Sequence, residues 1–500
     1  MCWPLMCGVC RITPSWRRSK PVSASTSGKV IPIVALPLAA DDGELVSLYA
    51  AQKKIYPRSV QGLFARWRWA MVLLTQLVFY GLPWLQYGQR QAVLFDLGAR
   101  RFYLFKLVLY PQDFIYLTGL LVVSALSLFL FTAVAGRLWC GFACPQTVYS
   151  EIFMWIERHI EGDRAARMRL DGGPLSVRKL ARKWAKHTVW MLLALWTGFS
   201  FVSYFTPARE LLQESLQWHF GSWEVFWGVF YSVATYGNAG FMREQVCKYM
   251  CPYARFQSAM FDKDTLIVSY DTARGDPRGS RSRKADPAAL GLGDCVDCTL
   301  CVQVCPTGID IRQGLQYECI GCAACVDVCD GVMDKMGYAR GLVRFATQNG
   351  IAGRWTARQM LRRVLRPRVL IYTLVLWTLG LGLMVSLALR TPLKVDVVRD
   401  RAALSRIVSG GQLENVYRLQ LMNATEMPQH YLLTAHGLPG LTLDAEPLVE
   451  VGAVQSRWVA VRLHIPYASA SPGSYPVVFD IQSADGVSRV SEKSMFFVPR

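Results

Sequence analysis

The stretch of sequence that decides the fold is Cys295-Val-Asp-Cys298-Thr-Leu-Cys301-Val-Gln-Val-Cys305-Pro306, followed by Cys319-Ile-Gly-Cys322-Ala-Ala-Cys325-Val-Asp-Val-Cys329-Asp330. Its cysteines follow the pattern C-x2-C-x2-C-x3-C twice, which is the spacing of ligand runs for cubane iron–sulfur clusters. A pair of four-thiolate zinc sites is the alternative, but such sites usually consist of separated CxxC pairs. The stretch therefore predicts an α+β domain that binds two [4Fe-4S] clusters.

The two runs also predict which cysteines share a cluster. In bacterial two-cluster ferredoxins the fourth cysteine of each run binds the cluster of the other run. We therefore expect a first cluster held by Cys295, Cys298, Cys301 and Cys329, and a second held by Cys319, Cys322, Cys325 and Cys305. Asp330 stands where a second proline would follow the run. This departure leaves both ligand sets whole and concerns only the local backbone and the potential of the second cluster.

Two further cysteine pairs share the phrase CxxxCP, in Arg137-Leu-Trp-Cys140-Gly-Phe-Ala-Cys144-Pro145 and Arg243-Glu-Gln-Val-Cys247-Lys-Tyr-Met-Cys251-Pro252. Proline is favoured at the first position of a helix, so helices are predicted over 147–160 and 254–261. The helix dipole favours a thiolate there. The four cysteines could close on a single soft ion such as Cu(I), hold a cluster or act as a redox dithiol. Buried apolar filler is the alternative without chemistry.

The rest of the composition is that of a membrane protein. Hydrophobic residues make up 52% of the 500-residue chain and charged residues only 18%, against roughly 25% charged in soluble domains. A helix needs about 20 mostly apolar residues to cross a bilayer. Five runs of this order predict five membrane spans, over 69–85, 114–135, 188–205, 216–239 and 369–389, with Glu224 inside the fourth.

Charge predicts the orientation of these spans. Residues 391–500 carry equal numbers of basic and acidic side chains, so the net charge of +19 lies in the first 390 residues. Lys and Arg gather between the second and third spans, and cytosolic loops collect such residues. We therefore expect a cytosolic N-terminus, all twelve motif cysteines on the cytosolic side, and residues 391–500 outside. The basic loops are expected to face anionic lipid and not nucleic acid.

The C-terminal part predicts an immunoglobulin-like β-sandwich. Residues 413–421 and 459–465 alternate apolar and polar side chains, and Asp485-Gly486 reads as a hairpin turn between 475–481 and 487–497. Met422, Met427, His430 and His436 could bind copper, but the alternation favours ordinary strand residues.

The predicted parts are a partly disordered cytosolic segment over 1–66, four spans with the CxxxCP motifs over 67–262, the ferredoxin-like domain over 263–345, a basic linker with the fifth span over 346–390, and the sandwich over 391–500. No cleavable signal peptide is expected. No function is assigned to Cys2, Cys7 or Cys10.

The chain resembles the FixG/RdxA/CcoG accessory proteins of the cbb-type cytochrome oxidase. The resemblance rests on the cysteines above and on Tyr80-Gly-Leu-Pro-Trp-Leu, Arg90-Gln-Ala-Val-Leu-Phe-Asp-Leu, Pro111-Gln-Asp-Phe-Ile-Tyr and Glu151-Ile-Phe-Met-Trp-Ile-Glu-Arg, and runs from about Ile55 to the C-terminus. It implies a protein of the bacterial inner membrane that reduces Cu(II) to Cu(I), with a periplasmic C-terminal domain. Copper is then substrate or bound ion, and Cys140, Cys144, Cys247 and Cys251 are implicated in handling it.

The resemblance also implies partners. They are a cytosolic electron donor, a copper chaperone or transporter, and oxidase subunits or assembly factors, while a homodimer is left open. Two other functions stay open. The CxxxCP pairs are similar to those of the NapH-type ferredoxins, which implies quinol-linked electron transfer, and the chain could instead be a non-enzymatic assembly scaffold.

Overall fold

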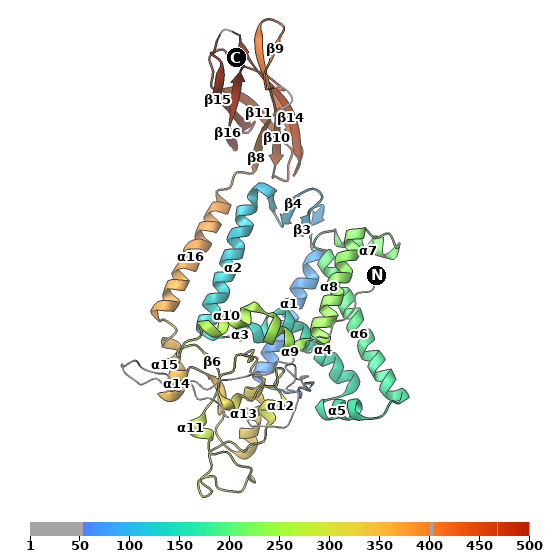
Figure 1. Ribbon diagram of the computed structural model, residues 1–500, viewed down its shortest axis with the longest axis vertical. Helices are drawn as coiled ribbons and strands as arrows, with labels where there is room; N and C mark the ends of the chain where they lie inside the picture. Colours follow the sequence, from blue (N-terminus) through green and yellow to red (C-terminus); the bar gives the residue numbers. More distant parts are fainter. Residues whose placement is uncertain (1–53, 401–403, 468, 500) are drawn as a thin grey trace, which may run out of the picture. The chain divides into compact units, whose positions relative to one another are not determined.

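The computed structural model describes residues 54–400, 404–467 and 469–499 (Figure 1). The chain divides into Met1–Lys54 and Ile55–Arg500, and all elements below belong to the second part. Most of the segment expected over 1–66, with Cys2, Cys7 and Cys10, lies outside the described residues.

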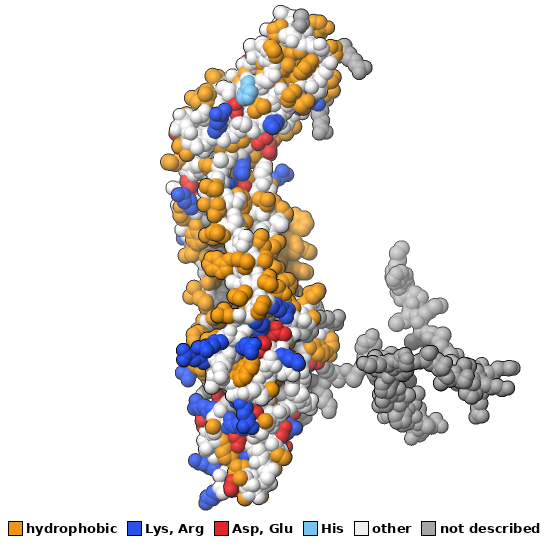
Figure 2. Space-filling model, turned by 90° about the vertical axis from the view of Figure 1, so that its left-hand side faces the viewer, with side chains coloured by type: hydrophobic (Ala, Val, Ile, Leu, Met, Phe, Trp, Pro, Cys, Tyr) orange, Lys and Arg blue, Asp and Glu red, His pale blue; other side chains and the backbone are white. Residues whose placement is uncertain are grey.

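Five long helices coincide with the five apolar runs. They are α1 (Leu63–Gly81), α2 (Phe114–Ala135), α6 (Val177–Val202), α8 (Ser222–Gly240) and α16 (Pro367–Ala388). Each exposes large apolar side chains, which monomeric soluble proteins rarely do over contiguous surfaces. Figure 2 shows such side chains gathered over the middle of one face, with Lys and Arg gathered beneath them.

Two of these helices, α16 and the segment Pro111–Ala135 that contains α2, are long and apolar enough to cross a membrane. That the other three also cross stays a prediction. The fourth run differs from the expected range of 216–239, because α7 (Ala208–Leu216) comes first and α8 begins only at Ser222. Glu224 lies in the first turn of α8, where its carboxylate accepts hydrogen bonds from Thr206 Oγ1 at 2.7 Å and from Gly221 N at 3.0 Å.

The helices form two groups in the contacts they make. Helix α2 packs against α16, and at their ends the buried Asp113 carboxylate accepts a hydrogen bond of 3.1 Å from Arg390 Nε. Helices α4 (Pro145–Glu161), α6 and α8 contact one another. Glu157 on α4, which is 2% exposed, pairs with Arg167 of α5 (Arg164–Gly172) at 3.1 Å and with Arg243 at 2.9 Å. Buried ion pairs therefore hold the helices of each group together near their ends.

Short strands connect α1 to α2 after the 3-10 turn η1 (Leu82–Trp84), in which Pro83 ends the first helix. They are β1 (Gln86–Tyr87), β2 (Arg90–Gln91), β3 (Val93–Asp96), β4 (Arg101–Leu104) and β5 (Leu107–Leu109), and the last three form an antiparallel sheet.

The cysteine-rich segment folds around strands β6 (Ile267–Tyr270) and β7 (Val343–Ala346), which pair antiparallel, and helices α12 (Leu300–Gln303) and α13 (Ala324–Met336). The short elements α11 (Thr272–Gly275), η4 (Ile311–Gln313), α14 (Gln348–Ala352) and α15 (Ala357–Arg362) complete it and the linker. Asp327 of α13 caps α1, because its carboxylate accepts hydrogen bonds from Phe64 N at 3.1 Å and Ala65 N at 2.7 Å. This cap fixes the segment to the first helix.

The C-terminal part is a sandwich of two antiparallel sheets. Its strands are β8 (Leu393–Arg399), β9 (Arg406–Val408), β10 (Gln412–Asn423), β11 (Gln429–His436), β12 (Thr442–Asp444), β13 (Leu448–Val451), β14 (Ser456–Pro466), β15 (Gly473–Ser483) and β16 (Arg489–Val498). One sheet has the order β12-β14-β10-β8, with β9 beside β10, and the other β13-β11-β15-β16. The predicted strands and the turn at Gly486, whose φ is 75°, are confirmed.

The four sulfur and imidazole side chains considered as copper ligands in the sandwich differ in their surroundings. Met422 is 2% exposed and packs in a small core with Tyr110, whereas Met427 is 66% exposed. His436 Nδ1 lies 3.3 Å from Asp480. Met422, His430 and His436 lie in strands, as the alternation favours, and Met427 lies in the connection between β10 and β11.

Candidate redox site

The two predicted ligand sets line two separate cavities. Cys295, Cys298, Cys301 and Cys329 line one of about 380 Å³, and Cys305, Cys319, Cys322 and Cys325 line another of about 350 Å³, together with Cys301. The remaining walls are mostly apolar, with residues such as Val268, Ile309 and Leu342. Four thiols around an apolar space are the donor set of a cubane cluster, so these residues fit two [4Fe-4S] clusters.

The backbone turns in the same way around both cavities. Thr299 and Ala323, which each follow the second cysteine of a run, have φ of 54° and 56° and precede the short helix α12 and the longer α13. A left-handed conformation is costly for residues other than glycine, and here it brings the second and third cysteines of each run to one cavity. Helix α13 continues past Asp330, because no proline follows Cys329, and Asp330 accepts a hydrogen bond from Gly341 N at 2.9 Å.

Polar groups contact the sulfur-bearing segments from outside. Thr307 Oγ1 lies 3.3 Å from Cys305 Sγ, and Arg281 donates to the carbonyl of Cys295 at 3.3 Å. Burial raises the pKa of the Cys301 thiol to about 11 and of the Cys319 thiol to about 12. Cluster binding must therefore displace protons from these thiols.

The CxxxCP pairs occupy equivalent places. Cys140 lies in α3 (Leu138–Phe142) and Cys144 is the N-cap of α4, while Cys247 lies in the π-helical turn η3 (Val246–Met250), after α9 (Arg243–Gln245), and Cys251 is the N-cap of α10 (Pro252–Met260). Both predicted helices are confirmed, and each begins at the proline. Backbone N–H groups of Gln146 and Thr147 lower the pKa of Cys144, but burial is the larger effect and raises it overall. The expected stabilisation of a thiolate by the helix end is therefore outweighed by the effect of burial.

The four CxxxCP thiols converge on one place, called the four-thiol site below. Each interacts electrostatically with the other three. Gln257 Nε2 and Oε1 each lie 3.5 Å from Cys140 Sγ. Over the described residues, no three His, Cys, Asp or Glu side chains are close enough to hold one metal ion. That the four cysteines close on a single soft ion such as Cu(I), hold a cluster or act as a redox dithiol therefore stays a prediction.

The four-thiol site packs directly on the loop of the second cluster. A Cβ placed on Gly141 would lie 2.8 Å from the Cα and N atoms of Cys322, so the two backbones are in contact. Cys140 and Cys247 pack against the apolar group that includes Ile320 and Cys322. Only glycine fits at position 141, and it lets the first CxxxCP motif approach the second run of cysteines closely.

Arg137 connects three of these segments. Its guanidinium donates hydrogen bonds to the carbonyls of Tyr317 and Cys319 in the loop of the second cluster and to that of Ala254 in α10. The side chain is 5% exposed. Sequence reasoning missed Arg137, Gly141 and Gln257. The available signal was that an arginine precedes the first cysteine of each CxxxCP pair by three or four residues.

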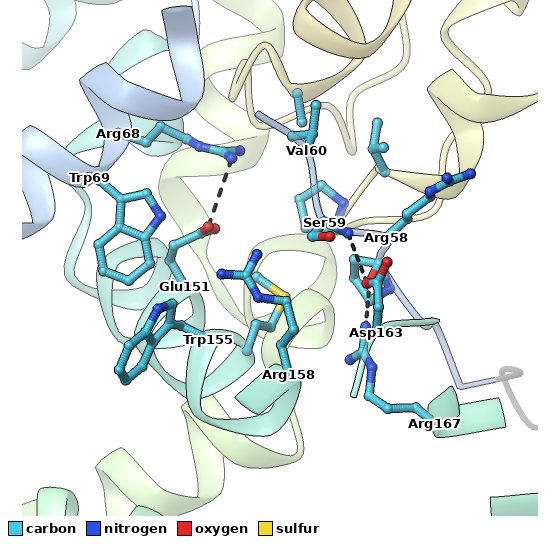
Figure 3. Close-up of a pocket in the computed structure, with 15 residues that line it drawn as sticks. Arg58, Ser59, Val60, Arg68, Trp69, Glu151, Trp155, Arg158, Asp163 and Arg167 are labelled. Atoms are coloured by element: carbon cyan, nitrogen blue, oxygen red, sulfur yellow. Dashed lines mark hydrogen bonds and ion pairs between the residues drawn. The ribbon is translucent and has the colours of Figure 1, made fainter. Parts of the chain in front are cut away.

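Two adjoining cavities lie next to the cysteine-rich segment, and Cys247 of the four-thiol site lines the second of them. The first, of about 580 Å³, lies where α1, α4 and the cysteine-rich segment meet (Figure 3). There Arg68 faces Glu151 at 3.8 Å, and Arg158 lies between Glu151 and Asp163. The second, of about 530 Å³, shares Arg68 and Glu151 with the first and is also lined by Glu244, Cys247 and Cys322. A small ligand could therefore reach both a CxxxCP thiol and the second cluster's loop.

Comparisons with known proteins identify the families that parts of this chain match. Residues 242–348 match the family of 4Fe-4S dicluster domains, residues 117–161 a family of 4Fe-4S binding domains, and residues 383–499 the family described as the Ig-like fold at the C-terminus of FixG. The nitrogen fixation protein FixG of Rhizobium meliloti is 40% identical over 79% of this chain and 82% of its own length. Protein RdxB of Cereibacter sphaeroides is 39% identical over 87% and 94%. A crystal structure of a FixG-related protein from Vibrio parahaemolyticus matches 22% of this chain and 97% of that chain, with 21% identity and a TM-score of 0.20.

Proposed function

The chain belongs to the FixG/RdxA family, also called CcoG, and from this premise we propose that it is a membrane-bound cupric reductase that supplies Cu(I) for assembly of a cbb-type cytochrome oxidase. The coarser description, an iron–sulfur electron-transfer protein of oxidoreductase type, rests on its two 4Fe-4S families and its relatives. Its two apolar helices and its relatives indicate a membrane protein.

Exposure supports a direction for the electrons. Cys298 of the first ligand set is exposed, whereas in the second set Cys322 is buried and Cys305, Cys319 and Cys325 are half-buried. Bound at these residues, two [4Fe-4S] clusters would supply one-electron carriers. A cytosolic donor protein can thus approach the first set from solvent, while the second set is shielded and faces the four-thiol site.

The contact between Gly141 and Cys322 is the observation that carries the proposal. It joins the second ligand set to Cys140, Cys144, Cys247 and Cys251 without an intervening layer of side chains. An electron that reaches the second set therefore has a short covalent and van der Waals path to the four-thiol site. A scaffold in which the clusters were only structural would not need this contact.

The proposed reaction at the four-thiol site is the reduction of Cu(II) to Cu(I). One electron converts Cu(II) to Cu(I), and one carrier is oxidised by one electron in the same step. Surroundings rich in sulfur favour Cu(I) over Cu(II) and so assist the reduction. The second cavity, with Glu244 and Cys247 in its wall, gives a small Cu(II) complex access to this place. Release of Cu(I) then requires a partner with comparable soft ligands, which is a copper chaperone or transporter.

The location of the site follows from the proposed topology. With five spans and a cytosolic N-terminus, both CxxxCP pairs and the cysteine-rich segment lie on the cytosolic side of the bacterial inner membrane. The sandwich then lies in the periplasm, where it can contact oxidase subunits or other assembly factors.

The experiment that tests this proposal measures Cu(II) reduction by the full-length protein under anaerobic conditions. Cys140→Ser/Cys144→Ser should abolish turnover while the spectra of the clusters at Cys295–Cys329 stay unchanged. Met495→Leu, in strand β16 of the sandwich and outside both cavities, is the matched control and should keep wild-type turnover. Equal turnover in all three proteins would remove the four-thiol site from the reaction. Oxidation of quinol in nanodiscs without copper would favour the NapH-type function instead.

A further inference from the structure

We propose that the four-thiol site holds a third [4Fe-4S] cluster, bound by Cys140 and Cys144 from one CxxxCP motif and by Cys247 and Cys251 from the other. The inference deepens the proposed function, because it identifies the carrier from which Cu(II) would take its electron. It concerns the same residues, but its test does not depend on copper.

The number and grouping of cysteines support a third cluster. The region that matches the 4Fe-4S dicluster family contains ten cysteines, two more than two cubanes need. The extra two are Cys247 and Cys251. The region that matches the other 4Fe-4S binding family contains only Cys140 and Cys144, which are too few for a cubane of their own. Together these leftover cysteines make one complete set of four ligands.

The geometry of the four-thiol site resembles that of the second predicted cubane. In both sets every cysteine interacts electrostatically with the other three. Across the described part of the chain, neither set brings three ligands within reach of a single ion. Cubane ligands behave in this way, because four thiolates surround a cluster of four metal ions and do not meet at one ion.

Charge at the site points to an anion. Arg137 is buried, and within the described ranges its guanidinium contacts carbonyl oxygens but no carboxylate. Its Nε atom is buried and has no hydrogen-bond partner among the described residues. A buried cation without a counter-charge costs several kcal/mol. Arg137 contacts the loop of Cys319 in the second ligand set and also faces Cys140 and Cys247 in the four-thiol site, so a cubane at each place would put negative charge beside this buried cation.

The polar surroundings also fit a cluster. Gln257 is buried, and its amide nitrogen lies 3.5 Å from Cys140 Sγ, where it can donate to a ligating sulfur. Hydrogen bonds to cluster sulfurs are one of the means by which a protein sets the reduction potential. The cluster would pass one electron to Cu(II) in the adjoining cavity, becoming oxidised by one electron as Cu(II) becomes Cu(I).

Metal analysis of the full-length protein tests the inference. After anaerobic purification without added copper, we expect about twelve iron atoms and about twelve acid-labile sulfides per chain, since each cubane holds four of each. Cys140→Ser/Cys144→Ser should contain about eight, and Met495→Leu should contain as much as the wild type. Mössbauer spectra should show that the iron lost in the cysteine variant had the parameters of a cubane.

Several outcomes are informative. A wild-type protein with about eight iron atoms, none of them lost in the cysteine variant, would overturn the inference. Stoichiometric Cu(I) bound at the same thiols would also overturn it, because those cysteines would then be copper ligands. If the double variant does not accumulate, wild-type stoichiometry and Mössbauer intensity decide alone. Twelve iron atoms without Cu(II) reduction would keep the third cluster and refute the cupric reductase, so the two proposals can fail separately.

Discussion

Replacing Gly141 by alanine tests the contact on which the electron path depends. The added Cβ would lie 2.8 Å from two backbone atoms of Cys322 and from the carbonyl carbon of Gly321. Ordinary contacts between such atoms are about 3.5–4.0 Å, so the two segments must separate by roughly 0.7 Å or more. Because no flexible side chain can move aside, we expect a cost of about 1–3 kcal/mol, as for other overpacked sites.

Hydrogen exchange measures this cost locally. A loss of 1–3 kcal/mol corresponds to exchange that is about 5- to 150-fold faster for amides in 138–145 and 319–325. Gly331→Ala is the matched control. It lies in α13 with no atom within 4 Å of an added Cβ, and alanine should stabilise this helix by about 0.5–1 kcal/mol. If Gly141→Ala exchanged as slowly as the wild type and transferred electrons to copper equally fast, the claimed contact would be refuted.

Three further predictions follow from single interactions. Gln257→Leu removes the donor 3.5 Å from Cys140 Sγ and should lower the midpoint potential of the centre at the four-thiol site in a redox titration, because hydrogen bonds to sulfur favour the reduced state; an unchanged potential would contradict this. Asp113→Asn leaves Arg390 buried without its partner, which should cost about 3–5 kcal/mol and accelerate proteolysis between α16 and β8. Burial would raise the pKa of Glu414, but hydrogen bonds from His464 and Arg406 hold it below its usual value of 4.5. The contribution of the Glu414 carboxylate to the free energy of unfolding of the sandwich should therefore be complete above pH 4.5 and be lost as the pH drops through the lowered pKa. Glu414→Gln should flatten this pH dependence in acid unfolding.

Much of the fold could be predicted because its signals are local. The helices after Cys144 and Cys251 follow from a proline at the first helical position. The sandwich strands follow from alternation of apolar and polar side chains. The boundary of α8 was missed because the run over 216–239 contains only one charged residue, although Gly221, the N-cap of α8, was an available signal for a break.

The site was predictable in its ligands but not in its assembly. The spacing of the cysteines predicts which of them bind the iron of each cluster. The structure groups the two predicted sets around two cavities. The approach of Gly141 to Cys322, the bridging by Arg137 and the cap of α1 by Asp327 join residues about 180 to 260 positions apart. No periodicity or motif encodes such long-range contacts, so the sequence could predict neighbouring redox centres only through the parity of membrane spans.

The central claim is that electrons from the cysteine-rich segment reach Cu(II) through the four-thiol site, and freeze-quench electron paramagnetic resonance tests it most directly. Protein reduced anaerobically is mixed with one equivalent of Cu(II), and the signals of Cu(II) and of reduced clusters are followed together. The account predicts that both signals decay at the same rate in a one-to-one ratio in the wild type, and that both persist in Cys140→Ser/Cys144→Ser. Persistence of both signals in the wild type, or equal decay in the variant, would contradict it.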